Sequence, residues 1–112
     1  MAIVKNTQVK IDVGLDENNI PEEMQWTALD GGVLDMETKA MLLSFWDAEK
    51  QETLKMDLWV KDMPMDQMQL FFHQTLMSLS ATYYRAKQDE KMTASMKDFC
   101  DFFAEKLALK KS

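Results

Sequence analysis

Two side chains of this sequence are suited to nucleophilic catalysis, Cys100 and His73. A nucleophilic cysteine needs a neighbouring base, and the chain has one cysteine and one histidine to offer. Both residues lie in segments with helical periodicity, and Cys100 falls on an apolar helix face beside Phe99 and Phe103. Burial among apolar side chains raises the pKa of a thiol and makes it inert. We therefore expect a core cysteine and a hydrogen-bonded helix histidine, and we predict that the protein is not an enzyme.

Metal and cofactor chemistry also find little support. Zinc needs three or four closely spaced Cys, His or carboxylate ligands, which one Cys and one His do not supply. Segments 16–19 and 30–37 carry acidic side chains, but neither follows the calcium-loop pattern, and both are typical of solvated turns. The three glycines form no phosphate-binding loop. The sequence therefore predicts no catalytic residue, no metal ligand and no cofactor.

Length, charge and cysteine content narrow the class of protein. The chain has 112 residues, enough for one domain (1–112) with a single apolar core, since 46% of the residues are hydrophobic. The net charge of −6 argues against nucleic-acid binding, which depends on Lys and Arg neutralising phosphates. A single cysteine fits a reducing compartment. The sequence shows neither the apolar core of a secretory signal nor a membrane-spanning stretch, so we expect a soluble, cytoplasmic protein without membrane insertion.

The first half of the chain has the period of β-strands. Apolar residues alternate with polar ones over 8–15, which places Val9, Ile11, Val13 and Leu15 toward the core. Segment 23–28 alternates again, with Met24, Trp26 and Ala28 inward, until Asp30-Gly31-Gly32 breaks the strand. Segment 33–37 has no readable period. Two long strands are expected over 39–47 and 52–61, although a helix over 36–46 is the alternative because the first of these does not alternate cleanly.

The second half has the period of α-helices. Asp62 is a candidate N-cap before Pro64, and apolar residues then recur at helical spacing to Tyr83. A polar segment over 87–91 separates a second helix. Four strands (about 7–61) followed by two helices (about 64–110) predict an α+β fold, a four-stranded antiparallel sheet with two C-terminal helices packed on one face.

Apolar side chains on both sides of the last two strands favour protein recognition. If Leu54, Met56, Leu58 and Val60 face the helices, Trp59 lies on the outer face, joined either by Leu42 and Trp46 or by Met41, Leu43 and Phe45. A monomeric domain seldom exposes such a patch, and Trp is enriched at binding hot spots. The alternative is that segment 29–38 covers this face. Met63 and Met65, with Met68, form a second candidate groove, although most of the eleven methionines fit core positions.

Several strings over 46–107 resemble the GldC family of gliding-motility proteins. They include Trp46-Asp47, Asp57-Leu58-Trp59, Lys61-Asp62-Met63-Pro64 and Phe71-Phe72-His73-Gln74-Thr75-Leu76, and the region 98–107 continues the likeness. Asp30-Gly31-Gly32 extends it upstream. The resemblance implies a small soluble protein that supports surface gliding in bacteria whose motility depends on type IX secretion. It implies no catalytic activity and no ligand, so it supplies no functional residues.

The order of strands and helices also resembles that of the export chaperone SecB, which is a likeness of fold alone. We expect a protein partner or client in the motility or secretion machinery, bound around Trp59, Trp46, Leu42, Met63 and Met65. The alternatives are a SecB-like chaperone for exported or motility proteins, and a structural subunit whose apolar face is buried in a homodimer or larger assembly.

Overall fold

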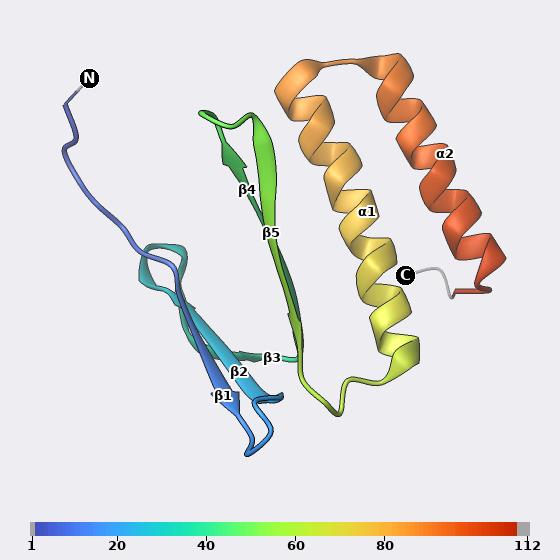
Figure 1. Cartoon of the computed structure of the whole chain (residues 1–112). Helices are drawn as coiled ribbons and strands as arrows, with labels where there is room; N and C mark the ends of the chain where they lie inside the picture. The colour runs from blue at the N-terminus through green and yellow to red at the C-terminus, as the bar shows by residue number, and fades with distance from the viewer. Residues whose placement is uncertain (1, 110–112) are drawn as a thin grey trace. The chain divides into compact units, whose positions relative to one another are not determined.

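The computed structural model describes residues 2–109. The chain divides between Met63 and Pro64 into two compact units, the first built of strands and the second of helices (Figure 1). This boundary lies where the sequence changes from a strand period to a helix period. The α+β class is confirmed. A single domain over 1–112 and the packing of the helices on one face of the sheet stay predictions.

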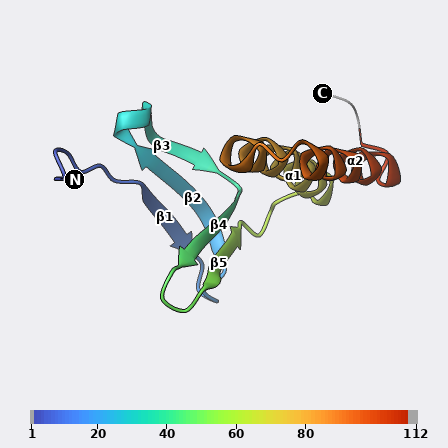
Figure 2. The same ribbon diagram turned by 90° about the horizontal axis from the view of Figure 1, so that it is seen from above.

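The first three strands form an antiparallel sheet in the order β1–β2–β3 (Figures 1 and 2). Their bounds are Lys10–Leu15 for β1, Pro21–Ala28 for β2 and Val33–Thr38 for β3, with a 3-10 turn, η1, at Leu29–Gly31. Gly32 follows this turn with φ of 75°, a left-handed angle that glycine takes without strain. The predicted break at Asp30-Gly31-Gly32 is thereby confirmed.

The prediction of one four-stranded sheet is wrong. The last two strands, β4 (Ala40–Asp47) and β5 (Glu52–Trp59), form a separate two-stranded antiparallel sheet. The helix considered for 36–46 is also wrong, because this segment is extended. Segments 33–38 and 40–47 follow one another with only Lys39 between them, and the first pairs with β2 while the second pairs with β5. This division adds the unpredicted strand β3, so residues 2–109 contain five strands in two sheets.

The buried part of the strand unit is small. Met24 in β2 is 1% exposed and Val60, directly after β5, is 2% exposed. Met24 lies opposite Val13 of β1 and Thr38 of β3, so these residues share one face of the sheet. The predicted inward placement is also confirmed for three further side chains, each of which is half-buried: Ile11, Trp26 and Ala28.

Two of the predicted core positions in the first strand are wrong. Val9 precedes β1 and is 67% exposed, while Leu15 is 53% exposed. At Leu15 the register shifts: Gly14 lies opposite Glu23 and Leu15 lies opposite Pro21, so Glu22 of β2 is the extra residue of a bulge. Because Leu15 is the last residue of β1 and lies opposite this bulge, it lacks a regularly paired neighbour to cover it, and simple alternation fails at that end.

Three charged residues tie the β1–β2 turn to the end of β5. Asp16 Oδ1 accepts hydrogen bonds from the backbone N–H groups of Asn18 (2.8 Å) and Ile20 (3.1 Å). Its Oδ2 lies 3.1 Å from Lys61 Nζ, which also lies 3.2 Å from Glu22 Oε1. The Ile20 and Asn18 hydrogen bonds, aided by Lys61, hold the pKa of Asp16 below its ordinary value.

The second unit is a helical hairpin of α1 (Met65–Lys87) and α2 (Glu90–Lys106). Gln88 ends α1 in the left-handed region at φ of 53°, and its N–H donates to the Tyr84 carbonyl at 2.7 Å. Asp89 then caps α2, because its Oδ1 accepts the Met92 N–H at 2.9 Å. The predicted break at 87–91 is confirmed. The second helix was predicted to reach about residue 110, which lies outside the described residues.

The predicted N-cap at Asp62 is wrong. Pro64 is the N-cap of α1, its backbone is extended, and no side chain caps the helix there. A residue that precedes proline is disfavoured in the helical region, so Met63 cannot be helical and Asp62 lies too early in the chain to cap. Among residues 2–109, no helix combines the length and apolar character needed to cross a membrane.

Candidate functional site

The β4–β5 hairpin positions the side chains that the sequence singles out for recognition. Its register pairs Ala40 with Trp59 and Asp47 with Glu52, without a bulge between them. The turn is fixed by Asp47, whose Oδ1 lies 3.1 Å from the Glu49 N–H and 3.2 Å from the Lys50 N–H. Gln51 completes it with φ of 53°. A turn held in this way sets which side chains share a face.

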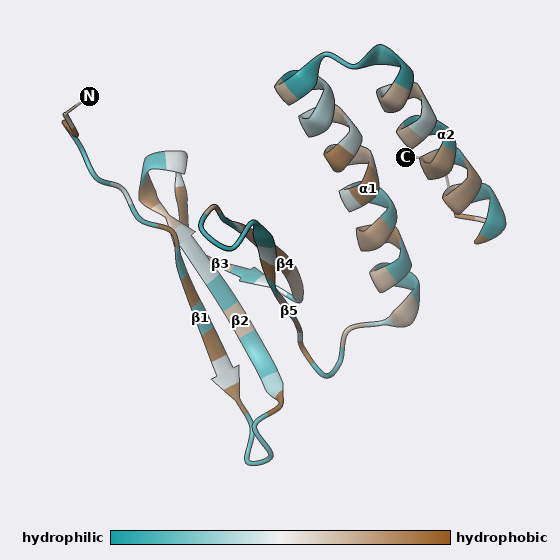
Figure 3. Ribbon diagram, turned by 45° about the horizontal axis from the view of Figure 1, so that its top comes forward, coloured by the Kyte–Doolittle hydropathy of each residue, from teal (hydrophilic) through white to brown (hydrophobic). Residues whose placement is uncertain are grey.

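One face of this hairpin is entirely apolar over three cross-strand pairs. We call it the apolar face, and its residues are Met41 with Leu58, Leu43 with Met56, and Phe45 with Leu54. Phe45 is 55% exposed, and Leu54 and Met56 are each 52% exposed. Brown apolar bands mark β4 and β5 in Figure 3, in contrast to the teal turn between them. Charged residues border this face at its two ends, with Lys39 before β4 and with Asp47 and Glu52 beside the turn.

The opposite face carries Leu42, Trp46 and Trp59 and is called here the tryptophan face. The two sequence alternatives are thereby resolved: Leu42 and Trp46 join Trp59, while Met41, Leu43 and Phe45 lie on the other side. Trp46 is 65% exposed and Trp59 is 53% exposed. Ser44, Thr53, Lys55 and Asp57 interleave with the three apolar side chains. Aromatic side chains set among polar ones are typical of protein interfaces.

The structure shows where the residues of the predicted methionine groove lie, but it does not test the groove itself. Met63 is half-buried in the segment after β5, where its N–H donates to the Val60 carbonyl at 3.1 Å. Met65 is the first residue of α1 and is 71% exposed. These two residues belong to different compact units, and their role in binding stays a prediction.

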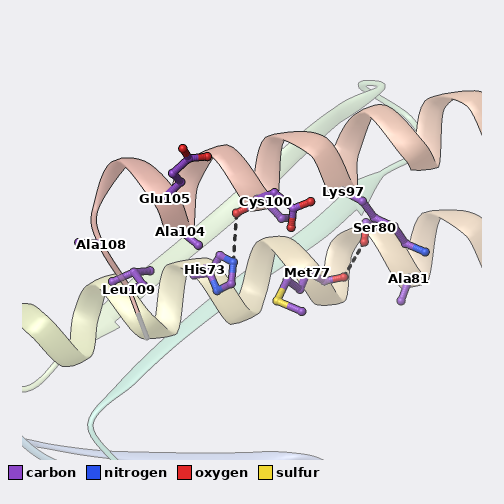
Figure 4. A pocket seen from close by; sticks show the side chains of 11 residues that line it. His73, Met77, Ser80, Ala81, Lys97, Cys100, Ala104, Glu105, Ala108 and Leu109 are labelled. Atoms are coloured by element: carbon purple, nitrogen blue, oxygen red, sulfur yellow. Dashed lines mark hydrogen bonds between the residues drawn. The ribbon is translucent and has the colours of Figure 1, made fainter. Parts of the chain in front are cut away.

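His73 and Cys100 meet across the helical hairpin, but through the backbone of Cys100 (Figure 4). His73 Nε2 lies 3.1 Å from the Cys100 carbonyl oxygen, and the imidazole stacks on Phe103 with ring centres 6.1 Å apart. A carbonyl only accepts, so Nε2 carries the proton and is not free to act as a base. Cys100 is 4% exposed, and this burial raises the pKa of its thiol. The arrangement matches the expected packing roles of both residues.

A groove of about 1000 Å³ runs along this side of the helical hairpin. Small side chains form much of its wall, and Lys97 and Glu105 add charge (Figure 4), as does Asp101. The sequence reasoning did not identify it. Its signal was available in Cys100 and Ala104, which lie four residues apart and so share one face of α2.

Within residues 2–109, no group of three or more His, Cys, Asp or Glu side chains is placed to hold a metal ion. The acidic turn at 16–19 uses Asp16 to bind its own backbone and Lys61. Four other aspartates each pair with one lysine, as Asp57 does with Lys55 at 3.4 Å; the other three are Asp12, Asp30 and Asp62. The geometry therefore directs attention to the two faces of the β4–β5 hairpin.

Comparison with known proteins gives one match. No curated protein and no solved structure matches the chain significantly. The family model described as gliding motility-associated protein GldC-like matches residues 21–109, which include four of the five strands and both helices. With most of its length matched, the chain belongs to the GldC-like family of gliding motility-associated proteins.

Proposed function

We propose that this protein is a non-catalytic accessory component of bacterial gliding motility, tied to type IX secretion, that works by binding another protein through the tryptophan face. The single observation that carries the proposal is the exposure of Trp46 and Trp59 on one face of one hairpin. Large aromatic side chains provide most of the binding energy at many interfaces, because they bury much area at small entropic cost. The cytoplasm is the compartment proposed for this encounter.

The shape of the tryptophan face suggests how a partner is held. Trp59 lies opposite Ala40, at one end of the hairpin, and Trp46 lies six residues from Ala40 along β4. At about 3.4 Å per residue, the two indoles anchor positions about 20 Å apart. Leu42 lies between them, flanked by Asp57 and Lys55, which can pair with charges of either sign on a partner. The surface therefore fits a polypeptide segment with two apolar anchors.

The test is Trp59→Asp in full-length protein, introduced into a gliding strain that lacks the natural gene. We expect the variant to fold normally, to lose partner capture by a photo-crosslinker placed at Trp46, and to glide poorly. Leu29→Asp is the matched control, since Leu29 is 68% exposed in η1 and lies outside the hairpin. Normal gliding and undiminished crosslinking in the Trp59→Asp strain would overturn the proposal.

The absence of catalysis has its own test. His73→Ala and Cys100→Ser remove the two side chains with nucleophilic or basic potential. We expect both strains to glide whenever the variant proteins remain folded. Loss of gliding in a variant of normal stability would instead point to chemistry at the helical hairpin.

A chaperone role is the second candidate, and the apolar face favours it. Three apolar cross-strand pairs without an intervening charge could hold extended segments of unfolded client proteins. A chaperone would suppress the aggregation of a denatured model client, and Met56→Asp would abolish this effect. The accessory-component proposal expects no suppression by the wild-type protein.

A further inference from the structure

We infer that the free edge of β4 pairs with β4 of a second copy of this chain, in antiparallel register centred on Leu43. The inference goes beyond the proposed function and does not depend on it. It rests on the distribution of charged residues along β4 and on which backbone groups of β4 are left unpaired by the β4–β5 ladder.

The composition of β4 is unusual for the edge of a sheet. Residues 40–46 contain no charged residue, no proline and no glycine. In the part of the chain that the structure describes, β4 forms ladder hydrogen bonds with β5 alone, so its other edge is unpaired. Edge strands are usually protected by charges, prolines or bulges, because open backbone groups pair readily with other strands. The other strand of this sheet, β5, carries Lys55 and Asp57, which provide such protection.

The ladder determines which backbone groups of β4 point outward. The Val60 N–H donates to the Lys39 carbonyl at 2.8 Å, so Lys39 and Val60 form a hydrogen-bonded pair. Hydrogen-bonded and non-hydrogen-bonded pairs alternate along an antiparallel ladder. Residues 41, 43 and 45 therefore bond to β5, whereas the N–H and C=O groups of Leu42, Ser44 and Trp46 point to the free edge.

Charge complementarity selects the register. Lys39 precedes β4 and Asp47 ends it, so β4 has a cation at one end and an anion at the other. Antiparallel pairing with Leu43 opposite Leu43 of the second copy sets each Lys39 opposite an Asp47. The same register sets Leu42 opposite Ser44, and both have backbone groups on the free edge. Shifting the pairing by two residues would set Lys39 opposite Phe45 in one direction. In the other it would set Lys39 opposite Glu49, which lies in the turn beyond the end of β4, and in neither case does Asp47 lie opposite a lysine.

Lys39 and Asp47, at the two ends of β4, already have contacts within the chain, and both could keep them in the dimer. Lys39 Nζ lies 3.6 Å from Asp62 Oδ2, an ion pair whose side chains are 44% and 70% exposed. Asp47 uses Oδ1 in the turn and keeps its other oxygen for a partner. The result is a four-stranded sheet, β5–β4–β4–β5, in which the apolar faces of both copies lie on the same side and join.

A disulfide trap tests the register in the full-length chain. Leu43→Cys is made together with Cys100→Ser, which removes the natural thiol. Non-hydrogen-bonded antiparallel partners have Cα atoms about 4.5 Å apart, within the range that a disulfide spans. We expect mild oxidation to give a covalent dimer. Phe45→Cys in the same background is the matched control, because its two copies would lie about 14 Å apart along the strand.

Sedimentation of proteins with altered edges provides the second readout. Ser44→Pro removes an N–H that points away from β5, so the hairpin keeps its own hydrogen bonds, while the paired edge loses one bond from each copy. We expect the dimer dissociation constant to rise about thirtyfold, as two ordinary hydrogen bonds would predict. Ser44→Ala should behave as wild type.

A wild-type chain that sediments as a monomer at tens of micromolar, or equal crosslinking through positions 43 and 45, would overturn the inference. Either result leaves the crosslinking and gliding tests of the tryptophan face unaffected. Conversely, a dimer trapped at Leu43 whose Trp59→Asp variant glides normally would support the edge pairing and refute the proposed function.

Discussion

Thr93 offers a sharp test of how the helical hairpin is stabilised. It lies in the first turn of α2, is 5% exposed, and its Oγ1 has no hydrogen-bond partner among the described residues. A buried polar group without a partner costs about 1–3 kcal/mol. Thr93→Val replaces the hydroxyl with a methyl group and keeps the branched shape, so it removes this cost without opening a cavity.

The expected gain can be bounded from the two terms involved. Removing the unpaired hydroxyl restores about 1 kcal/mol or more, and the added methyl buries apolar surface worth up to about 0.8 kcal/mol. Helix propensity contributes almost nothing, because Thr and Val rank together. We expect Thr93→Val to raise the free energy of unfolding by about 1–2 kcal/mol.

Urea unfolding followed by helical circular dichroism measures this gain. With an m-value of about 2 kcal/mol/M, the midpoint should rise by about 0.5–1 M. Thr93→Ser is the control, because it keeps the hydroxyl and loses the buried methyl, so its midpoint should fall. A Thr93→Val protein less stable than wild type, next to an unchanged Thr93→Ser protein, would mean that the hydroxyl is hydrogen-bonded in solution and would refute the reasoning.

Three further predictions concern the core, a helix cap and a pH-sensitive turn. Met24→Ala should destabilise the strand unit by about 2–5 kcal/mol in chemical denaturation, because Met24 is 1% exposed and its loss leaves a cavity. A loss of stability below about 1 kcal/mol would mean that the surrounding side chains collapse into the cavity. Asp89→Ala should cost about 1 kcal/mol through the lost cap to the Met92 N–H, and Asp89→Ser should recover most of it. The lowered pKa of Asp16 stabilises the folded protein above pH 3.8, the ordinary pKa of the group, and this stabilisation is lost as the pH falls through the pKa of the folded state. The difference in urea midpoint between wild type and Asp16→Asn should therefore narrow in acid. A difference that stays constant with pH would contradict this.

Strong periodicity in the sequence predicted most of the elements correctly. The helical spacing from Met65 onward and the alternation around Met24 each gave the right element, because burial of one face requires that period. β3 was not predicted because apolar and polar residues do not alternate clearly along it. Its apolar residues Leu34 and Met36 are not buried, being 67% and 50% exposed. Its extended form depends on pairing with β2 across the Gly32 turn, which no local pattern encodes.

The exposed apolar surface of the β4–β5 hairpin was predictable in kind but not in register. Leu42 and Leu43 are both apolar, so alternation alone cannot say which of them accompanies Trp59. The turn closed by Asp47 decides this, by setting Trp46 opposite Thr53. The groove beside Cys100 was missed for a different reason, since small residues leave a hollow only when a second helix lies alongside.

Nearly all substantial contacts within each unit join elements that follow one another in the chain: β1 with β2, β2 with β3, β4 with β5, and α1 with α2. Low contact order of this kind speeds folding and allows each hairpin to close as it leaves the ribosome. β4 ends at Asp47, and β5 is complete only at Trp59. At about 5–20 residues per second, β4 waits about 0.6–2.4 s for its partner strand during synthesis. Every residue inserted into the turn after Asp47 would lengthen that wait, so natural selection should keep this turn short.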